Sequence, residues 1–301
     1  MFLVTGASGR LFGRPVIDQL RRLVPAGQIV AATRDPAAAP DLHAAGVEVR
    51  RLDFSDSASL APALADVTGV LINGTNYGTP SGQRGAQHAR MIRAAAEAGI
   101  PRIVYTSWPD PGLYPLPGMS DFTESEALLR SQSPTATILR TTYGIAQAAG
   151  RDVTTAIARG TLAAPAAGAR TAPAHIDDLA EAAARVLASG EHPGQLYTLT
   201  AAESIDWADL AELASTITGK PIPYQAITDG QFTAAAHAQG IPQNLAAMFL
   251  GMYHAFRAGW TSTPTGDLAK IIGRTPKPAI EAVAAALAEQ QAGSNTADQR
   301  P

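Results

Sequence analysis

Three glycines near the start of the chain have a spacing that suits phosphate binding. Gly6, Gly9 and Gly13 follow an apolar run over residues 1–4 and precede an apolar stretch over residues 16–23. A strand, a glycine-rich turn and a helix in this order form the phosphate-binding turn of dinucleotide folds. Gly6 allows a tight turn, Gly9 lets the backbone approach a pyrophosphate, and the helix N-terminus offers free N–H groups and a positive dipole end. The opening stretch therefore predicts a dinucleotide site.

The second expected strand, residues 28–33, ends at Arg34 and Asp35. In dinucleotide folds an acidic residue at this strand end binds the ribose 2′-hydroxyl, whereas an arginine accommodates a 2′-phosphate. Arg34 comes first, so the sequence favours NADP over NAD. Arg34 could instead be a solvated loop residue, and Asp35 ahead of Pro36 also suits a helix cap.

Later strand ends add polar and aromatic residues that could contact a cofactor. Asp53 and Phe54 follow the strand expected over residues 47–52 and could flank an adenine ring, although Ser55 or Asp56 also suits a helix cap there. The strands expected over residues 67–72 and 102–106 are followed by Asn73, Gly74, Thr75, Tyr77, Ser107 and Trp108. Ligands of doubly wound sheets bind outside the carboxyl ends of the strands, so the loop over residues 73–78 is expected beside the nicotinamide.

Several aromatic side chains could contact a planar substrate. Tyr77, Trp108 and Tyr143 could stack on an aromatic molecule, and Tyr114 lies in a proline-rich loop that could cover the site. Tyr77 or Tyr143 could also donate a proton, and Ser107 is the third candidate for a catalytic role. The alternative for each tyrosine is a packed ring whose hydroxyl reaches solvent.

Strands alternate with helices through the first 145 residues, which predicts a doubly wound parallel sheet with helices on both faces. The expected strands are residues 1–4, 28–33, 47–52, 67–72, 102–106 and 136–141. We assign residues 1–150 to a dinucleotide-binding Rossmann domain. Residues 151–291 are expected to form a smaller, mainly helical substrate-cleft region, some segments of which return to the sheet, and residues 292–301 a flexible tail.

Helices dominate the expected second region. They are residues 179–187, 206–218, 229–238, 243–257, 265–272 and 277–291, with a strand over residues 195–200. Asp206 is expected to cap the helix that follows it. An apolar stripe at helical spacing comprises Met248, Phe249, Met252, Tyr253 and Phe256. We interpret this stripe as core packing rather than as a ligand wall.

The composition excludes several classes of function. The chain has 301 residues, 46% of them hydrophobic, a formal net charge of −3, and no cysteine. Nucleic acid and membranes are not expected as partners, and disulfides and cysteine nucleophiles are excluded. The six histidines are scattered, so no metal site is expected, and we interpret His88 as a satisfied helix residue. We expect a cytoplasmic, bacterial monomer or homodimer that binds a small molecule.

The order of short motifs along the chain resembles a known family. These motifs are the opening Val-Thr-Gly-Ala-Ser-Gly-Arg-Leu, Ala-Thr-Arg-Asp-Pro at 32–36, Asp-Phe at 53–54, the segment 94–107, His-Ile-Asp-Asp-Leu-Ala at 175–180, Tyr-Thr-Leu-Thr at 197–200 and Thr-Gly-Lys-Pro-Ile at 218–222. Together they resemble the NmrA-like atypical short-chain dehydrogenases, the group that includes type 2 quinone oxidoreductases. The similarity covers nearly the whole chain.

The resemblance implies a Rossmann domain that binds NADP and a smaller C-terminal part that forms the substrate cleft. By position, the phosphate loop comprises Gly6, Ser8, Gly9, Arg10, Leu11 and Phe12. Arg34 is the implied partner of the 2′-phosphate, and Asp53 and Phe54 flank the adenine. The implied nicotinamide side comprises Asn73, Gly74, Thr75 and Ser107.

Two positions depart from the pattern of the family. The usual spacing is Gly-x-x-Gly-x-x-Gly, and Phe12 stands where its third glycine would be. The phenyl ring could crowd the pyrophosphate, or the added residue could form a bulge that leaves the packing role to Gly13. Related quinone reductases have a histidine where this chain has Phe122, so a proton transfer that depends on that histidine cannot occur here.

The sequence lacks the usual machinery of carbonyl reductases. The Tyr-x-x-x-Lys pair, in which lysine lowers the pKa of tyrosine, has no counterpart, because Lys220, Lys270 and Lys277 are the only lysines and none follows a tyrosine at that spacing. Hydride transfer to a quinone or another activated acceptor needs less help. We therefore expect an NADP-dependent oxidoreductase acting on a quinone-like, aromatic or conjugated small molecule. The alternatives are a redox-neutral cyclase, isomerase or lyase of secondary metabolism, and a non-catalytic NADP-sensing regulator.

Overall fold

The computed structural model describes residues 1–9, 12–74, 82–113 and 119–297. The chain divides into two compact units. Unit 1 comprises Met1–Thr141, Ile176–Thr198 and Lys270–Gly273, and unit 2 comprises Thr142–His175, Leu199–Ala269 and Arg274–Pro301. The boundary expected after residue 150 falls inside a helix of unit 2, α6 (Tyr143–Arg159).

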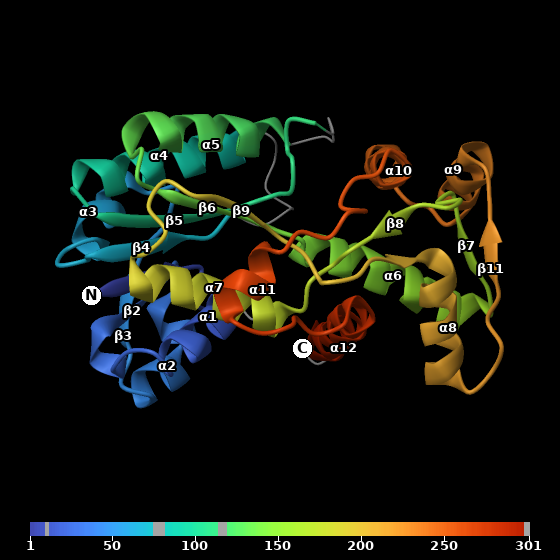
Figure 1. The fold of residues 1–301 in the computed structure, drawn as a ribbon, viewed down its shortest axis with the longest axis horizontal. Coiled ribbons are helices and arrows are strands. Elements are labelled where there is room, and N and C mark those ends of the chain that lie inside the picture. The colour runs from blue at the N-terminus through green and yellow to red at the C-terminus, as the bar shows by residue number, and fades with distance from the viewer. Residues whose placement is uncertain (10–11, 75–81, 114–118, 298–301) are drawn as a thin grey trace. The chain divides into compact units, whose positions relative to one another are not determined.

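Unit 1 is built on a seven-stranded sheet in the order β3-β2-β1-β4-β5-β6-β9 (Figure 1). The strands are β1 (Phe2–Thr5), β2 (Ile29–Thr33), β3 (Glu48–Arg51), β4 (Gly69–Ile72), β5 (Arg102–Ser107), β6 (Thr137–Thr141) and β9 (Leu196–Leu199). The pairings from β1 to β6 are all parallel. The strand order reverses between β1 and β4, as it does in the doubly wound Rossmann fold. The predicted fold class is confirmed.

Helices cover both faces of this sheet. They are α1 (Gly13–Leu20), α2 (Pro40–Ala44), α3 (Leu60–Ala63), α4 (Gln83–Glu97), α5 (Ser120–Gln132) and α7 (Ile176–Ser189). The helix α1 packs against α7 on one face, and α4 packs against α5 on the other (Figure 1). Every residue of β2 and β4 is buried, which explains why both strands are continuous apolar runs rather than alternating patterns.

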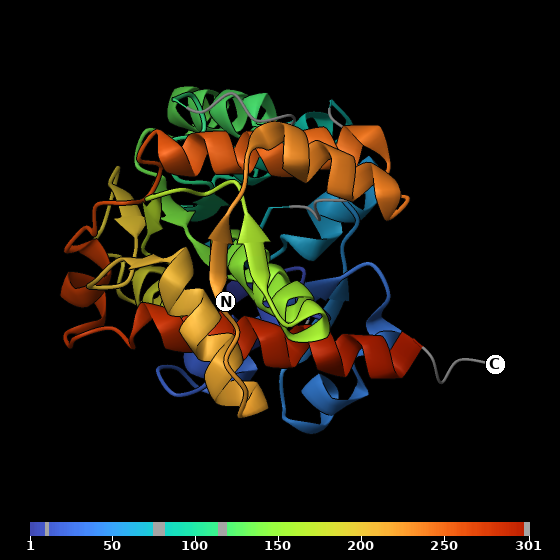
Figure 2. The same ribbon diagram turned by 90° about the vertical axis from the view of Figure 1, so that its right-hand side faces the viewer.

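Unit 2 is mainly helical. Its helices are α6, α8 (Trp207–Thr218), α9 (Asp229–Ala238), α10 (Gln243–Arg257) and α12 (Ala279–Ala297), and α11 (Asp267–Ile272) begins in it. Short strands pair as β7 (Leu162–Ala164) with β11 (Tyr224–Ala226), and as β8 (Arg170–Thr171) with β10 (Ile205–Asp206). The helix α6 packs against α8 and α12 (Figure 2). Asp206 caps α8 through a capping box with Asp209, as expected.

The helix α6 was not expected from the sequence. Its sequence contains Gly150, which weakens a helix by about 0.5–1 kcal/mol, and a run of β-branched residues. Tertiary packing compensates, because a Cβ on Gly150 would lie 3.3 Å from the backbone nitrogen of Leu287, so the glycine lets α12 approach closely. The helix α12 also continues to Ala297, beyond the expected end at 291, into the segment expected to be a flexible tail.

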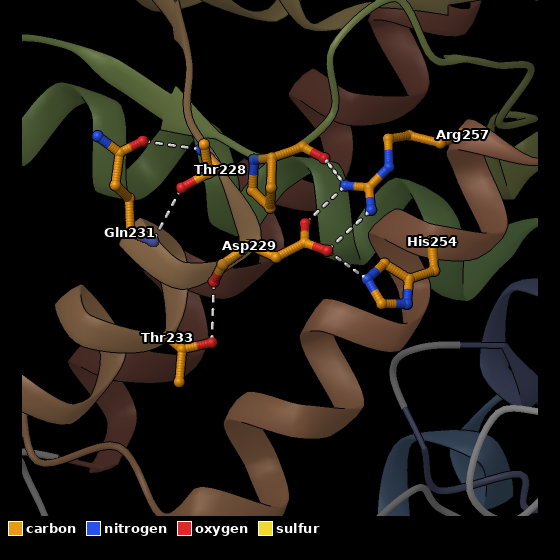
Figure 3. Close-up of polar contacts among 7 residues, drawn as sticks. Thr228, Asp229, Gln231, Thr233, His254 and Arg257 are labelled. Atoms are coloured by element: carbon orange, nitrogen blue, oxygen red, sulfur yellow. Dashed lines mark hydrogen bonds and ion pairs between the residues drawn. The ribbon is translucent and has the colours of Figure 1, made fainter.

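Polar contacts fasten α9 to α10 (Figure 3). Thr228 and Gln231 form a capping box at the start of α9. The carboxylate of Asp229 accepts hydrogen bonds from both terminal nitrogens of Arg257, at 2.9 and 3.1 Å, and lies 2.8 Å from the Nε2 of His254. Arg257 also donates to the carbonyl of Pro165. Within the described residues, no helix is long and apolar enough to cross a membrane.

Candidate functional site

The turn between β1 and α1 has the geometry of a phosphate-binding turn. Gly6 has a φ of +66°, which favours glycine, and the amide of Gly9 donates to the carbonyl of Gly6 at 3.0 Å. A Cβ on Gly13 would lie 2.3 Å from the Gly6 carbonyl oxygen. Gly13 therefore performs the packing role of the third glycine. This agrees with the interpretation in which the added residue forms a bulge.

Phe12 is the residue directly before α1 and is only 6% exposed. It offers no side-chain acceptor, so no side chain caps the first turn of α1. Within this turn Arg14 donates its amide to the carbonyl of Gly9 at 3.2 Å and Pro15 has no N–H group, so the amide of Gly13 is what the turn offers to a pyrophosphate. The expected contacts Arg10 and Leu11 lie outside the described residues.

The carboxyl end of β2 keeps an arginine available for a phosphate. Arg34 is exposed, and no side chain or backbone group among the described residues bonds its guanidinium. The hydroxyls of Ser8 and Thr33 lie 2.8 Å apart and tie the glycine-rich turn to the end of β2. The carboxylate of Asp35 accepts a hydrogen bond from the amide of Ala37 at 3.0 Å. Asp35 therefore caps the turn that follows, which was the second interpretation of this residue. The positive charge of Arg34 at this strand end therefore fits a 2′-phosphate.

Asp53 and Phe54 lie in a tight turn after β3. The carboxylate of Asp53 accepts the amide of Ser55 at 2.8 Å, and the backbone N–H of Asp53 donates to the hydroxyl of Ser59 at 3.0 Å. Phe54 is 8% exposed, and its carbonyl accepts a hydrogen bond from Arg90 of α4. These hydrogen bonds hold the turn in place, and its role beside an adenine stays a prediction.

Two threonines fix the backbone that follows β4. The hydroxyl of Thr106 donates to the Oδ1 of Asn73 at 3.0 Å and accepts the amide of Gly74 at 3.1 Å. The amide of Asn73 donates to the hydroxyl of Thr5 at 2.8 Å. Asn73 and Gly74 are thus held between the carboxyl ends of β1 and β5. Thr75 and Tyr77 lie outside the described residues.

Ser107 ends β5 with a hydroxyl that lacks a hydrogen-bond partner among the described residues, although the residue is 2% exposed. A buried hydroxyl without a partner costs about 1–3 kcal/mol. A ligand could supply this partner, which is consistent with the expected place of Ser107 on the nicotinamide side.

The side chains of Trp108 and Phe122 pack against each other. Their ring centroids are 6.4 Å apart, and both residues are at least nine-tenths buried. The ring of Phe122 also lies 5.7 Å from that of His88 and 5.5 Å below the guanidinium of Arg84. A Cβ on Gly74 would lie 3.4 Å from the Phe122 ring. Trp108 therefore presents little free ring area, and Tyr114 lies outside the described residues.

A buried polar cluster beside Phe122 was not anticipated. His88 is fully buried, with its Nδ1 3.0 Å from the Tyr105 hydroxyl and 3.2 Å from the Ser125 hydroxyl. Burial, and secondly the charge of Arg84, lowers the pKa of His88 to about 4, so the imidazole is neutral at pH 7. The interpretation of His88 as a satisfied helix residue is confirmed. Arg84 and Asp121 form an ion pair at 3.7 Å in the same cluster.

A signal for this cluster was present in the sequence. Arg84 and His88 on α4, and Asp121 and Ser125 on α5, are each four residues apart, so each pair lies on one helix face. The helices α4 and α5 pack together, which joins the two pairs.

Tyr143 lies in unit 2, at the first residue of α6. Its hydroxyl donates to the carboxylate of Glu289 at 3.5 Å and accepts from Gln147 at 3.1 Å. Burial, followed by the negative charge of Glu289, raises the pKa of Tyr143 well above its usual range. The hydroxyl therefore stays protonated and releases its proton reluctantly. In the part of the chain that the structure describes, no group of three or more acidic or histidine side chains could hold a metal ion.

Known proteins resemble most of the chain. The sequence profile of the NmrA-like family matches residues 1–277. Quinone oxidoreductase 2 of Escherichia coli (strain K12) is 33% identical over 283 residues, which cover 94% of this chain and 97% of that protein. The NAD(P)H azoreductase of Xenophilus azovorans is 25% identical over 284 residues, covering 91% of this chain and 93% of that protein.

Solved structures agree with these relatives. The NADPH-dependent quinone oxidoreductase of Escherichia coli, complexed with NADPH, matches with a TM-score of 0.84 and 32% identity over 94% of this chain and 99% of that chain. The triphenylmethane reductase of Citrobacter sp., complexed with NADP(H), matches with a TM-score of 0.83 and 30% identity over 95% and 99%. The coverage leaves no large part of the fold unmatched, and the chain belongs to the NmrA-like family.

Proposed function

We propose that the protein is an NADP-dependent reductase whose acceptor is a quinone-like, aromatic or conjugated small molecule. The observation that carries the cofactor assignment is the exposed guanidinium of Arg34 beside a turn closed by Gly6 and Gly13. An arginine at this strand end accommodates a 2′-phosphate. The relatives whose names include NADPH or NADP(H) support the same assignment.

Different residues of unit 1 would bind different parts of the cofactor. The turn and the first turn of α1 would hold the pyrophosphate, and Arg34 the 2′-phosphate. Asn73, Gly74 and Ser107 would hold the nicotinamide, because the backbone there is fixed and the Ser107 hydroxyl needs a partner. Bound NADPH would supply the hydride. Asp53 and Phe54 would flank the adenine.

The class of acceptor is inferred from a catalytic pair of residues that the chain lacks. The sequence has no Tyr-x-x-x-Lys pair to activate a ketone. An acceptor that is already electrophilic requires mainly binding and orientation. The relatives described above include a quinone oxidoreductase, an azoreductase and a triphenylmethane reductase, and quinones, azo compounds and triphenylmethane dyes are conjugated electron acceptors.

Two further assignments extend this proposal, namely the residue that donates the proton and the role of unit 2. We favour Tyr77 as the proton donor, since burial, followed by the charge of Glu289, raises the pKa of Tyr143 and keeps the proton on that hydroxyl. Ser107 orients rather than protonates. Unit 2 would form the substrate region, with Tyr143 as its candidate substrate contact.

Steady-state turnover tests the proposal. Purified protein is mixed with NADPH or NADH and with a benzoquinone, an azo dye or a triphenylmethane dye, and absorbance at the nicotinamide band is followed. We expect oxidation of NADPH that depends on the acceptor and exceeds that of NADH at least tenfold. Binding of NADPH without turnover on any acceptor would instead indicate an NADP-sensing regulator. Failure of both nucleotides to bind would favour a redox-neutral enzyme.

A further inference from the structure

An arginine at the carboxyl end of β6 joins α5 to the turn that follows β5. Arg140 pairs in the sheet with Ser107, the last residue of β5. Its Nε and one terminal nitrogen donate to the two carboxylate oxygens of Glu126 on α5, at 3.0 and 2.9 Å. Its other terminal nitrogen donates to the Oδ1 of Asp110 at 2.6 Å. One guanidinium therefore holds two carboxylates beside the strand that ends at Ser107.

Asp110 has a backbone conformation that side chains rarely adopt. Its φ is +41°, in the left-handed region that favours glycine. A residue in such a conformation persists where its surroundings fix it, and such residues cluster at functional sites. The amide of Leu113 donates to the carbonyl of Asp110 at 3.0 Å and closes the turn. The bond from Arg140 therefore holds the one residue of this turn whose backbone is strained.

Charge balance does not explain the contact between Arg140 and Asp110. The bidentate pair with Glu126, whose side chain is 9% exposed, already neutralises the guanidinium. The side chain of Asp110 is 48% exposed, so water and salt screen its ion pair, and the pair contributes little to the stability of the fold. What the contact provides is a fixed position for the turn after β5.

A second contact holds the same turn. Trp108 packs against Phe122, with their ring centroids 6.4 Å apart, and Phe122 lies one helical turn before Glu126 on α5. One apolar contact and one ionic contact, made by Trp108 and Asp110, thus set the direction in which the chain leaves β5. A shift of this turn would also move Ser107, whose buried hydroxyl lacks a partner among the described residues.

We propose that Asp110 is a positioning residue for hydride transfer. Its ion pair with Arg140 holds the turn after β5, so that Ser107 keeps the nicotinamide aligned with the acceptor. This inference rests on the proposed function. A misplacement of about 1 Å can lower the rate of a reaction about a hundredfold. The glycine-rich turn and Arg34 follow other strands, β1 and β2, so the affinity for NADPH should not depend on Asp110.

Two substitutions of Asp110 test whether the contact is required. Asp110→Ala removes the acceptor, whereas Asp110→Asn keeps an oxygen for Arg140 and tolerates the left-handed backbone. With NADPH and a benzoquinone, we expect Asp110→Ala to lower kcat at least about tenfold, because orientation is lost. Its Kd for NADPH, measured by titration calorimetry, should change less than about twofold, because the phosphate contacts remain. Asp110→Asn is expected to keep at least about half of the parent kcat, because its oxygen still accepts from Arg140.

Asp66→Ala is the matched control for backbone strain. Asp66 also has a positive φ, +59°, but it is exposed and precedes β4, at the end of the sheet opposite Ser107. We expect Asp66→Ala to lower the melting temperature as Asp110→Ala does and to leave kcat unchanged. The proposal is overturned by parental kcat in a folded Asp110→Ala protein, by an equal loss in Asp66→Ala, or by Asp110→Asn as slow as Asp110→Ala.

Hydrogen exchange tests the turn without turnover. Because the amide of Leu113 donates to the Asp110 carbonyl, its exchange rate reports whether the turn is closed. Mass spectrometry of a peptide that contains Leu113 should show exchange at least about tenfold faster in Asp110→Ala and unchanged in Asp110→Asn. If the parent oxidises NADPH with no acceptor, the proposed function fails. Unchanged exchange in Asp110→Ala would instead refute the role of the ion pair, whatever the parent turns over.

Discussion

A Cβ on Gly13 would lie 2.3 Å from the carbonyl oxygen of Gly6, a separation that no side chain tolerates. The glycine that lets α1 approach the end of β1 is therefore the one that follows Phe12. The residue added to the glycine-rich turn is absorbed before the helix begins, and the contact between turn and helix is preserved.

Gly13→Ala is expected to lower the free energy of unfolding by about 1–3 kcal/mol, because the new methyl group forces the turn and the helix apart. The affinity for NADPH is expected to fall at least tenfold in the folded variant. Calorimetric titration and thermal unfolding measure the two effects. The matched control is Gly27→Ala, since a Cβ on Gly27 meets no atom within 4 Å. Similar losses in both variants would contradict the role of Gly13.

His88 is expected to make stability depend on pH. Its pKa is lowered from 6.5 to about 4 in the folded protein, so between these values the unfolded chain binds the proton more readily. Stability is therefore expected to fall as pH drops from about 6.5 to about 4, by up to about 3 kcal/mol. Urea unfolding at several pH values measures this slope, which His88→Gln should reduce.

The control for this experiment is His43→Gln, which changes an exposed histidine of α2. It is expected to retain the slope of the parent. If His88→Gln and the parent lose stability in parallel below pH 6.5, the dependence arises from other groups.

Asp229 is expected to contribute modestly to the stability of unit 2. Its hydrogen bond to Arg257, followed by that to His254, lowers the pKa of Asp229, so this stabilisation is present above the unfolded pKa near 4 and is lost as pH falls further. The side chain is 43% exposed, so water and salt screen the pair and the contribution stays below about 1 kcal/mol. Asp229→Asn should lower the melting temperature slightly at pH 7 and not at pH 2. A loss of several kcal/mol would mean that the α9–α10 contact in Figure 3 carries more of the fold.

Two tyrosine variants distinguish the proposed proton donors. Tyr143→Phe is expected to change kcat less than about threefold, because burial and Glu289 keep the proton on that hydroxyl. Tyr77→Phe is expected to lower kcat about a hundredfold, a typical contribution of a general acid. Single-turnover rates with a quinone measure both. A large loss in Tyr143→Phe alone would transfer the role to Tyr143.

The parallel sheet could be predicted from the sequence, because buried strands such as β2 and β4 are short apolar runs bounded by turn residues. The helix α6 could not, since Gly150 weakens its pattern and only the close approach of α12 explains that glycine. Helix caps such as Asp206 were predictable, because a cap depends on neighbours in the chain.

The candidate site was less predictable than the fold. Local turns revealed the positions of Gly6, Gly13 and Arg34, which precede or follow strands. The partner of Tyr143 lies 146 residues away, and no local pattern indicates Glu289. The cluster around His88 depends on the packing of α4 against α5, which sequence spacing can suggest but cannot establish.

The most direct test of the account is the binding of NADPH and NADH to Arg34→Ala, measured by titration calorimetry beside the parent and Arg93→Ala. Arg93 is an exposed arginine of α4 and serves as the matched control for loss of charge. We expect Arg34→Ala to weaken the binding of NADPH at least tenfold and to leave that of NADH nearly unchanged, and we expect Arg93→Ala to affect neither. Equal weakening of both nucleotides, or none, would contradict the assignment of Arg34 to the 2′-phosphate.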